Sequence, residues 1–131
     1  MIATAATFAA AAGWWALRRR PIRVEIAGGS MRPSLEAGEW AIALRGVEIR
    51  RGDVAVVEHP GRPGFEMVKR VLAVPGDVAP TGRTLGPDEY WVEGDAPGAS
   101  TDSRTFGPVR RNHVKGAVRL VYWPFERRRR V

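Results

Sequence analysis

The sequence predicts a mainly β domain preceded by one short apolar segment. From Ile22 onward, short alternating or apolar runs recur, and stretches rich in glycine and proline separate them. No helical stripe of useful length follows residue 21. The 131 residues are enough for one domain with a modest core, and 15 glycines and 10 prolines suit many short strands joined by tight turns.

The expected strands follow one another closely along the chain. They are IRVEIA (22–27), WAIAL (40–44), DVAVVE (53–58), FEMVKRVLAV (65–74), YWVE (90–93) and GAVRLVYW (116–123). The connections PGRPG (60–64), PTGRTLGPDE (80–89) and GDAPGAS (94–100) have the composition of turns.

The first 20 residues form a segment of their own. No charged side chain precedes Arg18, and residues 2–17 are just long enough to span a bilayer. Trp14 and Trp15 lie where an interfacial aromatic belt would be. We expect residues 1–20 to be a single-pass membrane anchor. The alternative is an alanine-rich helix that lies on the domain or on the membrane surface.

The arginines around this segment predict its orientation. They follow the apolar run instead of preceding it, which argues against a cleavable signal peptide. If the segment spans a membrane, Arg18–Arg20 and Arg23 lie on the side of the folded domain. The positive-inside rule then places that domain on the cytoplasmic side of the cell membrane.

The positive charge gathers at two places. The clusters at 18–20 and 127–130 together account for the whole formal charge of +7. Because they lie at the ends of the chain, they favour lipid headgroups or a solvated tail over a nucleic-acid interface. We expect no nucleic-acid partner, and we expect residues 127–131 to form a basic tail after the domain.

Rare and missing side chains limit the chemistry. The chain has no cysteine, so disulfides, thiolate zinc sites and a cysteine nucleophile are excluded. Its two histidines, His59 and His113, lie in turn-rich or basic stretches without an evident orienting carboxylate. We expect both to be surface residues, and we expect neither a metal site nor a histidine-based triad.

The stretch GGSMRPSLEAGEW (28–40) presents a serine in open surroundings. Gly28 and Gly29 leave the approach to Ser30 uncrowded, and Pro33 restricts the backbone shortly after it. This arrangement suits a nucleophile that a substrate must reach. An ordinary turn is built in the same way, so the stretch alone does not decide between the two.

A lysine interrupts the longest apolar run, MVKRVLAV (67–74). Both faces of this strand are apolar, so we expect it to be interior and Lys69 to be buried. Burial would lower the pKa of the amine and make it a competent general base. The alternative is that Lys69 reaches the surface or pairs with a carboxylate. A Ser-Lys pair can perform acyl transfer without histidine.

Four segments in order resemble the signal peptidase I family of membrane-associated Ser-Lys endopeptidases, over roughly residues 24–124. They are GGSMRPSL (28–35), like the nucleophile box; RGDVAVVE (51–58), like a Gly-Asp-Ile-Val strand; VKRVLAVPGD (68–77), like the lysine box; and GDAPGASTDSRTFGPV (94–109), like the last box. Each is weak alone, but all four in order are specific. The resemblance implies a signal peptidase I or LexA-like β-rich catalytic fold over 21–126, without metal or organic cofactor.

The resemblance also implies the two principal catalytic roles. Ser30 would be the nucleophile, its backbone N–H would donate to the oxyanion, and Lys69 would be the general base. Two departures are visible in the nucleophile box: Ser34 stands where threonine is usual, and Gly28 stands where some relatives have a serine that assists the oxyanion. Other relatives lack that serine too.

The last box implies the supporting residues. Ser100 would hydrogen-bond the lysine amine and orient it. Asp102 and Arg104 would form a nearby ion pair that holds the loops, and Gly94 and Asp95 would shape the adjoining turn. This box departs from the family pattern at its start, where DAPGA (95–99) replaces a more polar stretch.

The substrate is the least determined part of the prediction. In its short length and in the sequence ASTDSRTFGPV (99–109), the chain resembles a subgroup of the family. This subgroup matures nickel-type superoxide dismutase by removing an N-terminal propeptide. A cytoplasmic domain suits that task, whereas general signal-peptide processing is the main alternative. A LexA-like repressor is disfavoured because we see no room for a helix-turn-helix before Val24. A non-catalytic, basic, membrane-tethered binding module is the alternative of another class.

Overall fold

A computed structural model describes residues 19–131, so the expected membrane anchor falls almost entirely outside the described residues. Strands dominate the described part, which confirms the prediction of a mainly β domain. The strands are β1 (Pro21–Glu25), β2 (Trp40–Leu44), β3 (Val54–Glu58), β4 (Glu66–Ala73), β5 (Glu89–Glu93), β6 (Val109–Arg110), β7 (Val114–Trp123) and β8 (Arg129–Arg130). The short helical elements are η1 (Pro97–Ala99), α2 (Ser103–Phe106), η2 (Arg111–His113) and η3 (Phe125–Arg127). Within residues 19–131, no helix is long and apolar enough to cross a membrane.

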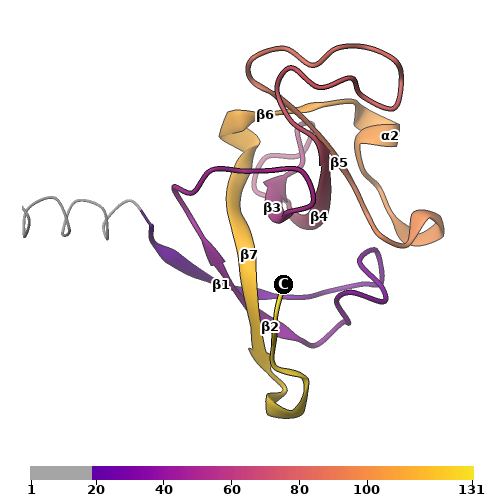
Figure 1. Cartoon of the computed structure of the whole chain (residues 1–131). Coiled ribbons are helices and arrows are strands. Elements are labelled where there is room, and N and C mark those ends of the chain that lie inside the picture. Colours follow the sequence, from indigo (N-terminus) through magenta and orange to yellow (C-terminus); the bar gives the residue numbers. More distant parts are fainter. Residues whose placement is uncertain (1–18) are drawn as a thin grey trace, which may run out of the picture.

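The strands form one curled antiparallel sheet in the order β1-β2-β7-β3-β4-β5-β6, and β8 adds to β7. The long strand β7 joins the two halves of the sheet (Figure 1), because its C-terminal part pairs with β2 and its N-terminal part with β3. At Gly116, which pairs with Val56 of β3, a Cβ would lie 2.8 Å from the carbonyl oxygen of Leu44 in β2. This close approach of two backbones requires glycine.

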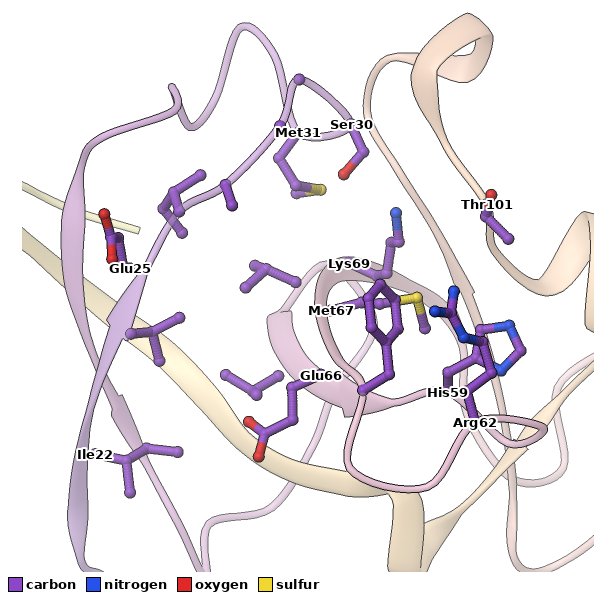
Figure 2. Close-up of a pocket in the computed structure, with 18 of the residues that line it drawn as sticks. Ile22, Glu25, Ser30, Met31, His59, Arg62, Glu66, Met67, Lys69 and Thr101 are labelled. Carbon is purple, nitrogen blue, oxygen red and sulfur yellow. The ribbon is translucent and has the colours of Figure 1, made fainter.

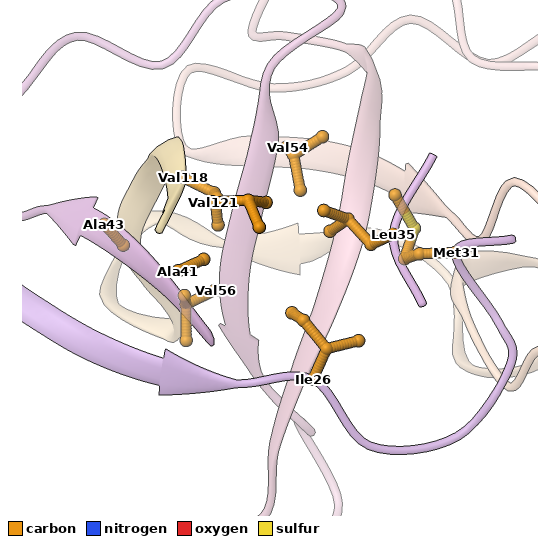
Figure 3. Close-up of a cluster of buried hydrophobic side chains, with 9 residues drawn as sticks. All are labelled: Ile26, Met31, Leu35, Ala41, Ala43, Val54, Val56, Val118 and Val121. Atoms are coloured by element: carbon orange, nitrogen blue, oxygen red, sulfur yellow. The ribbon is translucent and has the colours of Figure 1, made fainter. Parts of the chain in front are cut away.

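Three apolar clusters are buried in the described part of the chain, and β3 contributes to the two larger ones. Val54 and Val56 belong to the first cluster, together with side chains of β2, β7 and the loop between β1 and β2 (Figure 3). Ala55 and Val57 belong to the second cluster, which also takes side chains from β4, β5, β6 and β7. A strand buried on both faces is a continuous apolar run, which explains the sequence VAVV here.

Strand β4 only partly matches its expected burial. It lies between β3 and β5, and the face that carries Lys69, Val71 and Ala73 is buried. On the other face Val68 is half-buried and Leu72 is 42% exposed. The prediction that both faces are covered is therefore wrong for the second face, since Val68 borders an open groove and Leu72 lies at the surface.

The segment after β7 contains a short strand that the sequence does not predict, although Arg127, Arg128, Arg130 and Val131 are exposed. The turn η3 reverses the chain, and β8 then pairs with β7 through Leu120↔Arg130 and Val121↔Arg129. Four consecutive arginines show no apolar alternation that would predict a strand. The partner of Arg129 is a buried carboxylate far away in the sequence, which composition cannot reveal.

Candidate active site

A groove of about 750 Å³ lies between β1 with its following loop on one side and β4 with the turn at 59–65 on the other. Ser30 and Lys69 both line it. Figure 2 shows the hydroxyl of Ser30 and the side-chain nitrogen of Lys69 directed toward each other. Within the described residues no hydrogen bond joins the two side chains, so the amine is held by another partner.

The loop that carries Ser30, residues 27–38, begins with a turn that needs glycine. Gly28 has a φ of +74°, in the left-handed region that other residues rarely adopt. Gly29 has no such requirement, and a Cβ there would touch only the flexible side chain of Arg32. The carbonyl of Ser30 accepts a hydrogen bond of 2.8 Å from the backbone N–H of Ala96. Within the described chain, no hydrogen bond uses the N–H of Ser30.

The same loop, called the nucleophile loop below, is fixed by backbone hydrogen bonds at its ends and by side chains that pack in the core. Its ends are joined because the N–H of Ile26 donates to the carbonyl of Glu39 and the N–H of Gly38 donates to that of Ile26, both at 2.8 Å. Met31 and Leu35 point into the first apolar cluster and are almost completely buried (Figure 3). Ser30 therefore lies on a short loop whose neighbouring side chains are part of the core.

Lys69 is a buried lysine, as the sequence predicts. It is only 4% exposed. Its Nζ donates a hydrogen bond of 3.0 Å to the hydroxyl of Ser100. Burial lowers the pKa of Lys69; the charge of Arg104 lowers it further, whereas the carboxylate of Asp102 opposes the shift. The environment thus favours the neutral amine, which is the form that accepts a proton.

Asp102 holds this part of the site together. Its fully buried carboxylate accepts hydrogen bonds from the Ser100 hydroxyl at 2.6 Å and from the Gly94 N–H at 2.9 Å. The Arg104 guanidinium donates to it at 2.6 and 2.9 Å, and the Arg104 N–H at 3.1 Å, so Asp102 also caps α2. Burial raises the pKa of Asp102, but these donors outweigh burial and hold the pKa well below its ordinary value.

Gly94 is placed where no side chain fits. A Cβ at this position would lie 2.6 Å from the carbonyl oxygen of Ser30 and 2.7 Å from the Cβ of Ser100, and would also clash with the Ser100 hydroxyl. Its φ is not in the left-handed region, so the requirement for glycine comes from packing alone. Gly94 is thus the point at which the nucleophile loop and the segment that carries Ser100 meet.

Asp95 has a more specific contact than the turn-shaping role expected of it. Its carboxylate pairs with the guanidinium of Arg70 at 2.8 and 3.0 Å and accepts a hydrogen bond of 2.6 Å from the hydroxyl of Ser34. The hydrogen bonds with Arg70 lower the pKa of Asp95, and that with Ser34 adds to the effect, although burial opposes it. Ser34 was singled out in the sequence only as a substitute for threonine. Its hydroxyl is the feature that both residue types share.

The two histidines differ from the expectation that both are surface residues. His59 is half-buried, lines the groove and packs against Phe106 with ring centroids 4.9 Å apart. Its Nδ1 accepts a hydrogen bond of 3.0 Å from the N–H of Gly61. His113 is also half-buried, and its Nδ1 has no partner within the described residues. Turn composition predicted the turn at 60–64 but not that this part of the chain lines the groove.

Comparison with known proteins gives a consistent result. A family model described as signal peptidase, peptidase S26, matches residues 1–82 and 78–123. Mitochondrial inner membrane protease subunit 2 of Mus musculus is 35% identical over 129 residues, which cover 83% of this chain and 70% of that protein. Subunit 2 of Danio rerio is 36% identical, with 83% and 67% covered. Subunit 1 of Mus musculus is 30% identical over 115 residues, with 78% and 69% covered.

Proposed function

Since the chain belongs to the signal peptidase family, peptidase S26, we propose that it is a serine endopeptidase that removes an N-terminal leader or propeptide from a precursor protein. Ser30 is its nucleophile and Lys69 its general base. The observation that carries this proposal is the buried amine of Lys69, which shares a groove with Ser30 and has a lowered pKa. A lysine at the surface would be protonated and could not accept a proton.

The contacts of Lys69 support this assignment. Its Nζ donates to Ser100, and Ser100 in turn donates to the carboxylate of Asp102. This chain of donors leaves the lone pair of a neutral amine free to accept the proton of Ser30. Ser100 and Asp102 therefore orient the base, in the way that a carboxylate orients the histidine of a conventional triad.

The reaction follows from these positions. The oxygen of Ser30 attacks the scissile carbonyl while Lys69 accepts the hydroxyl proton. The tetrahedral intermediate collapses to an acyl-enzyme as Lys69 gives that proton to the leaving amine. Water, deprotonated by Lys69, then releases the acyl group and restores Ser30. The unused N–H of Ser30 is the natural donor to the oxyanion, an interaction whose removal costs about 100- to 1000-fold in rate.

The groove suits an extended polypeptide next to Ser30. Apolar side chains from both sides line it, including Ile26, Met31 and Val68. Its volume, about 750 Å³, is within the range of ordinary binding pockets. An apolar lining beside the nucleophile favours uncharged side chains of the substrate before the cleaved bond.

Two precursor classes are candidates. The resemblance of residues 99–109 supports the propeptide of nickel-type superoxide dismutase, which a cytoplasmic-facing domain could reach. General signal-peptide processing is the alternative. The mitochondrial relatives carry "inner membrane" in their names, which supports action at a membrane surface. In this proposal residues 1–20 are the anchor and the folded domain lies on the cytoplasmic side.

The test is mass spectrometry of new N-termini in cells that express the wild type, Ser30→Ala or Lys69→Ala. Each strain carries a nickel superoxide dismutase precursor and a secretory precursor. We expect a cut in the dismutase precursor that both substitutions abolish, with full-length enzyme present at equal amounts. A Ser30-dependent cut in the secretory precursor instead would identify a general signal peptidase and contradict the cytoplasmic orientation.

The remaining outcome separates enzyme from binding module. If neither precursor shows a Ser30-dependent cut, and a survey of all cellular N-termini also shows none, the peptidase proposal fails. A non-catalytic membrane-tethered module would then be the better description. Variants at Ser30 and Lys69 would in that case alter nothing beyond stability.

A further inference from the structure

The C-terminal strand returns to the base of the nucleophile loop. Arg129 in β8 donates four hydrogen bonds from its guanidinium. Two go to the carboxylate of Glu39, at 2.6 and 3.0 Å; one goes to the carbonyl of Ser34, at 2.5 Å; and one goes to the carbonyl of Arg127, at 2.8 Å. One side chain from β8 thus reaches Ser34 within the loop that carries Ser30 and Glu39 directly after that loop.

Glu39 is the buried carboxylate that accepts two of these hydrogen bonds from Arg129. It is completely buried at the end of the nucleophile loop, and its carboxylate also accepts a hydrogen bond of 2.6 Å from the N–H of Glu36. The hydrogen bond with Arg129 lowers the pKa of Glu39 although burial opposes it, so the carboxylate is ionised. A buried carboxylate without a cation is strongly unfavourable. Arg127 lies 4.0 Å from the same carboxylate, but within the described residues Arg129 is the arginine that donates hydrogen bonds to it, so the loop depends mainly on Arg129.

Ser34 connects this contact to the strand that carries Lys69. Its carbonyl accepts from Arg129, while its hydroxyl donates to Asp95 and lies 3.3 Å from a guanidinium nitrogen of Arg70. Arg70 follows Lys69 directly in β4. The nucleophile loop is thus held between β4 on one side and β8 on the other.

We propose that Arg129 is a positioning residue that sets the distance and direction between Ser30 and Lys69, an inference that rests on the proposed peptidase function. It touches neither the substrate nor the reacting atoms. It acts by holding the nucleophile loop through Ser34 and Glu39. Without it the loop samples other positions, so fewer molecules present Ser30 to Lys69 and the chemical step slows.

The pattern of kinetic effects distinguishes this role from a merely structural one. Loss of Arg129 should lower kcat with little change in KM. It should leave the pH at which activity rises unchanged. The pKa of Lys69 depends on its burial and on the charges of Asp102 and Arg104, and Arg129 contacts none of these residues. Lysine lacks the planar guanidinium with which Arg129 donates to Glu39 and Ser34 at the same time, so Arg129→Lys should give only partial rescue.

The experiment compares Arg129→Gln, Arg129→Lys and the matched control Arg130→Gln in the full chain. The substrate is a peptide spanning the junction that the wild type cuts in cells. We expect kcat to fall by about 10- to 100-fold in Arg129→Gln, less in Arg129→Lys, and not in Arg130→Gln. Amide exchange should become faster in residues 29–36 of Arg129→Gln but not in β4.

A second control covers loss of overall stability. Val109 is completely buried in the second cluster, away from the nucleophile loop, so Val109→Ala lowers stability without touching the loop. If it slows cleavage as much as Arg129→Gln at equal stability, the positioning role is overturned. An unchanged kcat in Arg129→Gln overturns it too. If the wild type itself cuts nothing, the proposed function fails, whereas the exchange measurement still reports on the loop.

Discussion

Two carboxylate–arginine pairs hold the two halves of the candidate site, and they differ in how the chain builds them. Asp102 and Arg104 are two residues apart, and their pair supports Lys69 through Ser100. Glu39 and Arg129 are 90 residues apart, and their pair supports the loop of Ser30. Both carboxylates are fully buried, and both have lowered pKa values.

The difference shows what a short motif can and cannot encode. The first pair forms within one turn at the start of α2, so local geometry brings it together wherever that turn is made. The second exists only after β7 and β8 have folded back on β2, so it reports on completed tertiary structure. The surroundings of Lys69 are thus built locally, whereas the loop of Ser30 is held by contacts that need the whole fold.

The largest effect should come from filling the space at Gly94, where the two halves meet. In Gly94→Ala the new Cβ would displace Ser100 from Lys69 or push the Ser30 carbonyl away. We expect precursor cleavage to fall by about 100-fold or more, because small displacements of reacting groups have effects of this size. The control is Gly98→Ala, where a Cβ meets open space. Equal activity of the two variants would show that the halves tolerate separation.

The next effect tests the long-range pair through stability. Because the pKa of Glu39 is lowered in the folded chain, the charge of Glu39 stabilises the fold above its usual pKa of about 4.3, and this contribution is lost as the pH falls through the folded value. We expect Glu39→Gln to lower the free energy of unfolding at pH 7 by about 2 kcal/mol.

Urea unfolding at pH 7 and in acid measures this difference. Wild type and Glu39→Gln should converge as the pH falls. Glu36→Gln is the control, because Glu36 forms an exposed pair with Arg32 and such pairs contribute little. A stability difference that stays constant down to acid pH would show that the charge of Glu39 is not the stabilising feature.

A smaller effect sharpens the role of the local pair. The charge of Arg104 lowers the pKa of Lys69, so Arg104→Gln should raise that pKa and move the rise of kcat/KM to higher pH. At neutral pH we expect a fall of about 10-fold, the size of one hydrogen bond to a charged group. The pH profile of cleavage measures it. A profile that moves to lower pH would contradict the proposed electrostatics.

The smallest effect concerns the link between the two halves. Ser34→Ala removes one hydrogen bond to Asp95, whose pair with Arg70 remains, so we expect a loss of about 1 kcal/mol in unfolding free energy. Ser34→Thr keeps the hydroxyl and should match the wild type. Thermal unfolding of both variants measures whether the hydroxyl at position 34 stabilises the fold. If Ser34→Thr is as unstable as Ser34→Ala, the hydroxyl is not what this position provides.

The sequence by itself determined the mainly β fold and indicated that Lys69 is buried, whereas the site residues around Asp102 came from the family resemblance. Alternating and continuous apolar runs indicate strands. The contacts of Ser100, Asp102 and Arg104, which the resemblance implied, are made over a few residues of the chain. The pairing of Ser30 with Lys69 followed from the residues and was strengthened by the resemblance, and the structure brings both side chains into one groove. The catalytic roles of these residues stay a prediction.

Only the tertiary structure decided how the nucleophile loop is held. In the sequence, Glu39 is an acidic residue before an expected strand, and Arg129 is one of four consecutive arginines in an expected basic tail. Their identity as a buried pair depends on β8 pairing with β7 and on the loop closing over the first apolar cluster. A long-range pair leaves no periodicity or spacing in the sequence, because its two residues become neighbours only when the chain between them has folded.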